Sequence, residues 1–68
     1  MLHFSHKYVV QWVVPYDLQT AEFVDKFKGI VKQVNGVYFD SQAYSFILET
    51  DSTEIVNKFV RYCEDYNK

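Results

Sequence analysis

Hydrophobic and polar positions in the first half of the chain predict one strand followed by one helix. Residues 7–14 are mostly β-branched or aromatic, and they stop at Pro15, which has no N–H group to donate to a sheet. This pattern predicts a strand. Apolar residues then recur at helical spacing over 18–34, with Asp17 as a candidate N-cap and Asn-Gly at 35–36 as a typical C-terminus. The spacing therefore predicts a helix.

The second half predicts a hairpin and a second helix. Residues 37–40 form a short apolar run, polar residues suited to a turn follow it, and 43–50 form a longer run of aromatic and aliphatic residues. Asp51, followed three residues later by Glu54, resembles a capping box. The apolar residues after it recur at helical spacing nearly to the end of the chain.

The resulting order is β-α-β-β-α in a single small α+β domain over 1–68. This order matches the ferredoxin-like plan without its last strand, a two-layer sandwich of one sheet and two helices. In that plan the connection through the first helix is right-handed and the last strand inserts between the other two, which gives an antiparallel sheet of order 1-3-2. We therefore expect the first strand to lie at an edge, with two helices on one face.

The other face of such a sheet is left open. Side chains alternate between the faces along each strand, and if the helices cover the smaller side chains of the hairpin, the open face carries aromatic rings. The sequence leaves the phase of the first strand open, so that face gains one of two sets from it: Tyr8 and Trp12, or Val9, Gln11 and Val13. The residues that we expect to bind a partner are Tyr8, Val10, Trp12, Tyr38, Tyr44 and Phe46. In the alternative arrangement, the larger rings face the helices.

The size of the chain favours association with a partner. It has 68 residues, of which 49% are hydrophobic and 19% aromatic. Below about 70–80 residues a single apolar core rarely supplies more than about 3–5 kcal/mol. Cys63 is the only cysteine, which excludes a disulfide within the chain. Because residues 8–14 contain no charge, proline or glycine to protect an edge strand, we expect this strand to pair with a second copy or with another protein.

Charge and hydropathy exclude two classes of partner. The net charge is −2, with seven basic and nine acidic residues spread along the chain, which is unlike the basic footprint of a duplex nucleic-acid binder. No apolar run is long enough to span a bilayer, and residues 1–7 lack the features of a signal peptide. We therefore expect no membrane partner and a cytoplasmic location, in the host cell if the protein is viral.

One short segment resembles a nucleic-acid-binding signature. Residues 42–47 resemble the third strand of RNA-recognition motifs, with Tyr44 and Phe46 at the two stacking positions. The segment departs from the signature at Gln42 and Ala43, which replace a basic residue and a glycine. This resemblance implies an alternative function, the binding of single-stranded RNA or DNA by an aromatic sheet face.

A second segment resembles a nuclease family. Residues 13–18 end a strand in Tyr-Asp-aliphatic, as in the first strand of the Cas2 nucleases of CRISPR systems. The resemblance implies a metal-dependent nuclease in which Asp17 helps to hold a divalent metal, and the 1-3-2 plan places Asp40 at the same rim. Pro15 interrupts this motif, and the arginines that often follow it are absent.

No other segment indicates catalysis or a cofactor. His3, His6 and Cys63 are the only soft metal ligands, too few and too far apart for a zinc site. Cys63 lies in the apolar stripe of the second helix, which indicates a core residue. We therefore predict no catalytic residue, metal or cofactor. The expected function is that of a non-catalytic protein-binding module, of an adaptor or inhibitor type found among small regulatory and viral accessory proteins, acting as a homodimer through an edge strand and an aromatic sheet face.

Overall fold

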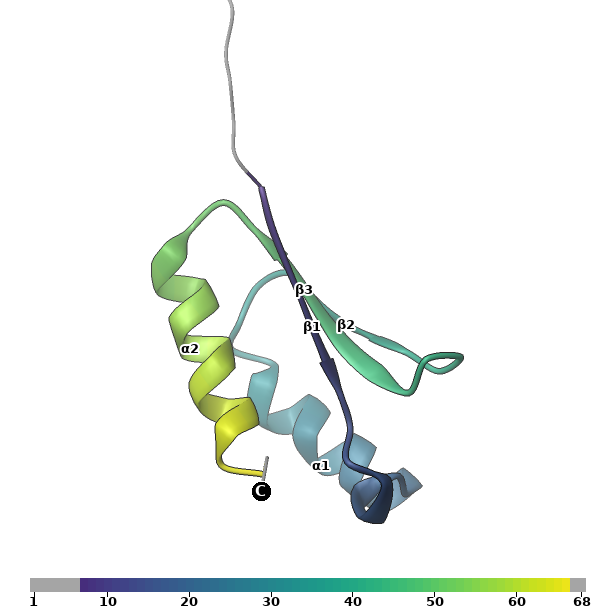
Figure 1. Ribbon diagram of the computed structural model, residues 1–68. Coiled ribbons are helices and arrows are strands. Elements are labelled where there is room, and N and C mark those ends of the chain that lie inside the picture. The colour runs from purple at the N-terminus through teal and green to yellow at the C-terminus, as the bar shows by residue number, and fades with distance from the viewer. Residues whose placement is uncertain (1–6, 67–68) are drawn as a thin grey trace, which may run out of the picture.

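The computed structural model describes residues 7–66. Its elements follow the predicted order of strand, helix, strand, strand and helix, with one short 3₁₀ helix added after the first strand (Figure 1). They are β1 (Tyr8–Val13), η1 (Tyr16–Leu18), α1 (Ala21–Val31), β2 (Val37–Asp40), β3 (Ser45–Thr50) and α2 (Thr53–Glu64).

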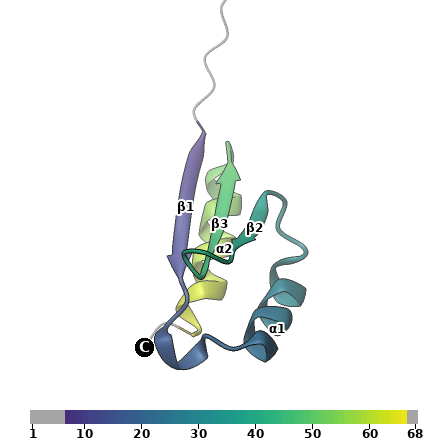
Figure 2. The ribbon, with the colours of Figure 1, turned by 90° about the vertical axis from the view of Figure 1, so that its right-hand side faces the viewer.

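The sheet has the predicted topology. Its three strands lie in the order β1-β3-β2. β1 pairs antiparallel with β3 from Tyr8 opposite Thr50 to Val13 opposite Ser45, and β2 pairs antiparallel with the other side of β3. Both helices lie on one face of this sheet and leave the other face open (Figures 1 and 2). The fold prediction is thus confirmed, and β1 is an edge strand.

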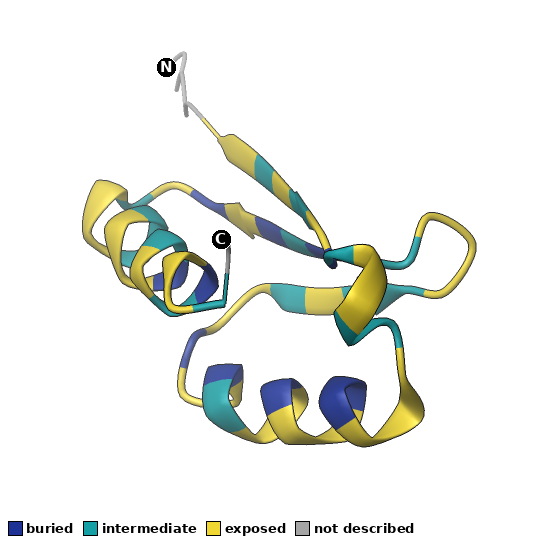
Figure 3. Cartoon of the chain, turned by 60° about the horizontal axis from the view of Figure 1, so that its bottom comes forward, coloured by how far each residue is buried: buried dark blue, intermediate teal, exposed yellow. Residues whose placement is uncertain are grey.

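The core lies between the sheet and the helices and is built largely from aromatic rings. Phe46 of β3 and Phe27 of α1 expose 1% and 0% of their surface, and their ring centroids are 4.7 Å apart. The Trp12 ring of β1 packs on Phe27 at 5.0 Å. Phe59 of α2 is fully buried, and the buried positions of both helices face the sheet (Figure 3). The helices therefore cover the larger side chains of β1 and β3, because these rings bury the most apolar area.

Both helices start later than the sequence pattern predicts. Thr20 caps α1, because its hydroxyl accepts the backbone N–H three residues ahead at 3.1 Å. Ser52 caps α2 in the same way at 3.4 Å. The predicted caps, Asp17 and Asp51, are wrong. Asp17 lies within η1, where the chain is already turning after Pro15, so the hydroxyl residue nearest the regular helix takes the cap position.

The hairpin turn also shortens β3 relative to the prediction. Tyr44 has a positive φ of 48°, so the strand begins only at Ser45. Asp40 shapes the turn, because its carboxylate accepts the backbone N–H groups of Gln42 at 3.0 Å and Ala43 at 3.4 Å. This is the local turn chemistry that aspartate commonly provides.

Candidate functional site

Exposed apolar side chains gather along β1 and just beyond it. Among the described residues, five large hydrophobic side chains are exposed: Tyr8, Val9, Val13, Tyr16 and Tyr38. Four of these five belong to residues 8–16, and Val9 and Val13 expose 63% and 56% of their surface. β1 therefore carries more exposed large hydrophobic side chains than any other element that the structure describes.

The backbone of β1 has unpaired groups along its outer side. Val14 donates its N–H to the carbonyl of Tyr44 at 3.0 Å. In an antiparallel pair, hydrogen-bonded residues alternate with residues whose N–H and C=O groups point away from the neighbour. With the observed register, the outward-pointing groups on β1 belong to Val9, Gln11 and Val13, called the edge residues below. They offer three donors and three acceptors to a further strand.

The side chains of the edge residues lie on the open face of the sheet. Gln11 reaches across it, and its Nε2 donates a hydrogen bond of 2.9 Å to Ser45 Oγ. Ser45 is fully buried between the flanking strands. The two valines make no such contact, and within the described residues no strand lies along the outer side of β1. The backbone that can pair and the side chains that are exposed thus belong to the same three residues.

A shallow apolar hollow runs beside β1 on the helix face. It has a volume of about 200 Å³ and lies between β1 and α2. The residues that line it are Val10, Gln11, Trp12, Phe59, Val60, Cys63 and Glu64. Glu64 is the only charged residue among them. A strand added to β1 would place its own inward side chains over this mainly apolar surface.

The opposite edge of the sheet has charged neighbours. β2 has four residues, and a hollow of about 320 Å³ beside it is flanked by Lys28 and Lys32 of α1. Both lysines are exposed, and Lys28 Nζ lies 5.4 Å from the centroid of the Phe39 ring. Short length and nearby lysines are common protections of an edge against further pairing. β1 has six residues, none of which is charged, and a single lysine, Lys7, directly precedes it.

The structure corrects the predicted aromatic face. Phe46 was expected on the open face but is 1% exposed and belongs to the core. Trp12 is likewise packed against the core, and Val10 on the same side of β1 lines the hollow next to α2. The prediction was wrong because the helices cover the larger side chains of β3 rather than the smaller ones. Of the two sets that the sequence allowed for the first strand, the edge residues are the set that lies on the open face.

The remaining predicted binding residues are scattered. Tyr38 is half exposed on the open face of β2. Tyr44 lies in the turn and packs on Phe39 with ring centroids 5.3 Å apart. Tyr8, on the same side of β1 as Trp12, is 42% exposed at the end of the strand. Trp12 has a buried Nε1 without a hydrogen-bond partner. With Phe46 inside, the hairpin does not present two neighbouring rings for base stacking.

Within residues 7–66, the candidate metal ligands do not form a cluster of three or more. The structure shows no group of three or more His, Cys, Asp or Glu residues that could hold a metal within the described part, 7–66. Asp40 is engaged in the hairpin turn. His3 and His6 lie outside the described residues. Burial raises the pKa of the Cys63 thiol to about 12, and Glu64 adds to the shift, so this cysteine is a protonated core residue at neutral pH.

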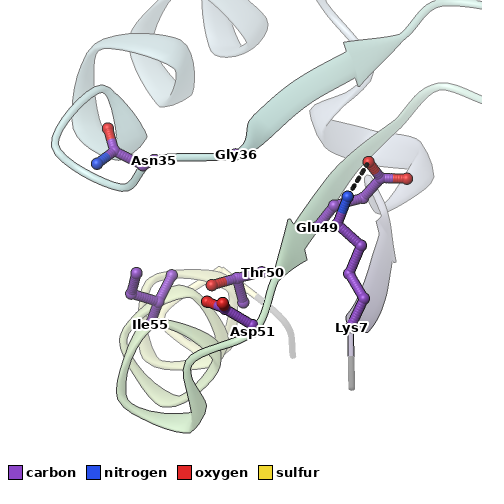
Figure 4. A pocket seen from close by; sticks show the side chains of 7 residues that line it. All are labelled: Lys7, Asn35, Gly36, Glu49, Thr50, Asp51 and Ile55. Carbon is purple, nitrogen blue, oxygen red and sulfur yellow. Dashed lines mark ion pairs between the residues drawn. The ribbon is translucent and has the colours of Figure 1, made fainter. Parts of the chain in front are cut away.

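Another hollow is open and is lined mainly by polar and charged residues. Its volume is about 490 Å³, and it lies where β1 begins and β3 ends (Figure 4). Lys7 and Glu49 approach to 4.0 Å at its side, and the Thr50 hydroxyl already accepts the Ser52 N–H at 3.1 Å. Asp51 also lines it. Three of its polar side chains, those of Lys7, Glu49 and Thr50, are thus engaged in contacts within the chain.

Comparisons with protein-family models, with curated proteins and with solved structures found no match. No helix within residues 7–66 combines the length and the apolar character needed to cross a membrane. The fold and the site therefore define a class: a small α+β domain in which one edge strand has six uncharged residues and, within the described part, no neighbour along its outer side.

Proposed function

We propose that this chain is a non-catalytic protein-binding module that acts through the outer edge of β1, and that its partner is a second copy of itself. The observation that carries the proposal is the coincidence, in the edge residues, of unpaired backbone groups and exposed valine side chains. Strand addition to a sheet edge is a common mode of recognition, in which backbone hydrogen bonds supply affinity and side chains supply specificity.

Energetics support the proposal. Each backbone hydrogen bond gained contributes about 0.5–1.5 kcal/mol net, and apolar burial adds about 25 cal/mol per Å². A domain of this size seldom has more than about 3–5 kcal/mol from its own core. The gross gain from pairing at β1 is therefore comparable in size to the net contribution of the core, and part of it offsets the entropy cost of association.

We further propose that this binding role is exercised in the cytoplasm. Cys63, the one strong nucleophile among the described residues, is held as a thiol by burial. Lys7, Glu49 and Thr50, which line the hollow of about 490 Å³, are engaged in contacts within the chain. We include adaptor and inhibitor roles in the proposal. A module that adds its edge strand to the sheet of a second copy can add the same strand to the sheet edge of a larger protein.

Charges placed on the β1 edge test this proposal. We expect the unmodified chain to have the mass of a dimer by light scattering at micromolar concentration. The double variant Val9→Lys, Val13→Lys should be a folded monomer, because two ammonium groups per edge repel a second copy. Tyr38→Lys is the matched control: it lies on the same open face and is half exposed, and it should stay dimeric. A monomeric unmodified chain, or a dimeric double variant, would contradict the proposal.

A further inference from the structure

The backbone geometry points to one particular pairing, and we propose that two copies join β1 to β1 antiparallel about a twofold axis at Gln11. The two three-stranded sheets then become one continuous sheet of six strands. This inference rests on the proposed function and specifies its register. In this register Gln11 faces Gln11 of the second copy, and Val9 faces Val13 of the second copy.

The phase of β1 selects this register. All three edge residues point their backbone groups outward. When the twofold axis passes through Gln11, each edge residue of one copy lies opposite an edge residue of the other copy. Three hydrogen-bonded pairs result, each exchanging two bonds. A shift by one step in one direction would place Val9 opposite Pro15, which has no N–H to donate. A shift in the other direction would place the charged Lys7, which precedes the strand, opposite Val13.

Charge selects the antiparallel direction. Lys7 precedes β1 and Asp17 follows it by a few residues, and both are exposed. Antiparallel pairing brings Lys7 of each copy next to the Pro15–Asp17 end of the other, so opposite charges approach. Parallel pairing would place the two Lys7 side chains beside each other. Unlike charges across a pair of strands stabilise it and like charges oppose it.

The side chains also match across the axis. On the open face, Val9 and Val13, which expose 63% and 56% of their surface in one chain, would cover each other in two symmetric pairs. β-branched pairs of this kind favour sheet formation. On the helix face, Val10 would lie opposite Trp12 of the second copy, above the apolar hollow that these residues share with α2.

The same arrangement closes the assembly at two copies. A twofold axis uses the same surface of both chains, so both β1 edges are consumed. The two free ends of the six-stranded sheet are then the β2 edges. These are short and flanked by Lys28 and Lys32, which discourages addition of further copies.

Cysteine cross-linking tests the register. Residues in a hydrogen-bonded antiparallel pair have Cα atoms about 5.5 Å apart, within the disulfide range of about 4.4–6.8 Å. Gln11→Cys should therefore form a disulfide-linked dimer under mild oxidation. The single variant Val9→Cys should not form this disulfide. Val9 faces Val13 of the second copy, so the two copies of Val9 are offset by four residues, or about 14 Å, along the strand. A chain carrying both Val9→Cys and Val13→Cys should cross-link again.

The controls are built into the chain. Cys63 is buried and its thiol has a raised pKa, so the unmodified protein should give no cross-linked band. Tyr38→Cys reports random collisions on the same open face. The double-cysteine chain keeps Gln11 and its hydrogen bond to Ser45, so it tests the register even if Gln11→Cys fails to fold.

The outcomes separate the register from the function. A dimeric mass together with cross-linking through Gln11→Cys and through the Val9 and Val13 pair supports the register. Two results overturn the register and leave the proposed dimer intact, provided that the mass is dimeric. In the first, the single variant Val9→Cys cross-links. In the second, none of the cysteine variants cross-links more than Tyr38→Cys. A monomeric unmodified chain by light scattering overturns both.

Discussion

Proline substitutions at two neighbouring positions of β1 provide the most direct test of how the edge is built. Val9 points its N–H away from β3, whereas the register makes Val10 and Leu48 a hydrogen-bonded pair. Proline removes the N–H in each case. In Val9→Pro the lost donor is the one that we assign to the second copy. In Val10→Pro the lost donor belongs to the sheet.

Val10→Pro should lower the free energy of unfolding much more than Val9→Pro does. Val10→Pro loses a sheet hydrogen bond and leaves the carbonyl of Leu48, a residue with 0% exposure, without its partner. A lost bond plus a stranded buried acceptor costs about 2–4 kcal/mol, most of what a domain of this size has. Val9→Pro should cost the isolated chain less than about 1 kcal/mol, because proline is tolerated on an edge strand where its missing N–H would face solvent.

Urea unfolding followed by Trp12 fluorescence measures both effects. If the folded species is a dimer, its free energy of unfolding rises by about 1.4 kcal/mol for each tenfold increase in protein concentration. We expect this dependence in the unmodified chain, its absence in folded Val9→Pro, and a largely unfolded Val10→Pro. Equal losses of stability in the two variants would refute the assigned phase of β1. A concentration-dependent midpoint in Val9→Pro would refute the role of its N–H in pairing.

Two further predictions concern single residues. Gly29→Ala should stabilise the fold by about 0.5–1 kcal/mol in urea unfolding, because a helical Cβ there would meet no atom within 4 Å. Gly36→Ala should destabilise the fold by more than about 1–2 kcal/mol, because Gly36 has a φ of 97° and an added Cβ would clash with the Glu49 carbonyl. A Gly36→Ala variant of unchanged stability would contradict this backbone conformation. Cys63 should resist a thiol reagent at pH 8 until the chain unfolds. Because folding raises the pKa of its thiol from 9.0 to about 12, the free energy of unfolding should fall as the pH rises from about 9 towards 12. That part of the pH dependence should vanish in Cys63→Ala, and fast labelling of the folded protein would refute the burial of the thiol.

The order and kind of the elements could be predicted from the sequence because local patterns determine them. The β-branched run before Pro15 and the helical spacing of the next apolar residues each allow one regular structure. Sheet order followed from the handedness of the crossover and the short hairpin connection. The unprotected edge was also visible, since the absence of charge in residues 8–14 is a property of the sequence itself.

Two features were decided by tertiary packing. The first is which face of each strand meets the helices. β3 carries an apolar residue on each face, Ile47 on one and Phe46 and Leu48 on the other, and packing of the Phe46 and Trp12 rings against Phe27 places these rings inside. The second is the outward set of the edge strand. Whether Val9 or Val10 turns its N–H to solvent depends on the register with β3, which arises from contacts between residues far apart in the chain. Local sequence can thus specify an adhesive strand, whereas three-dimensional packing selects the groups it offers to a partner.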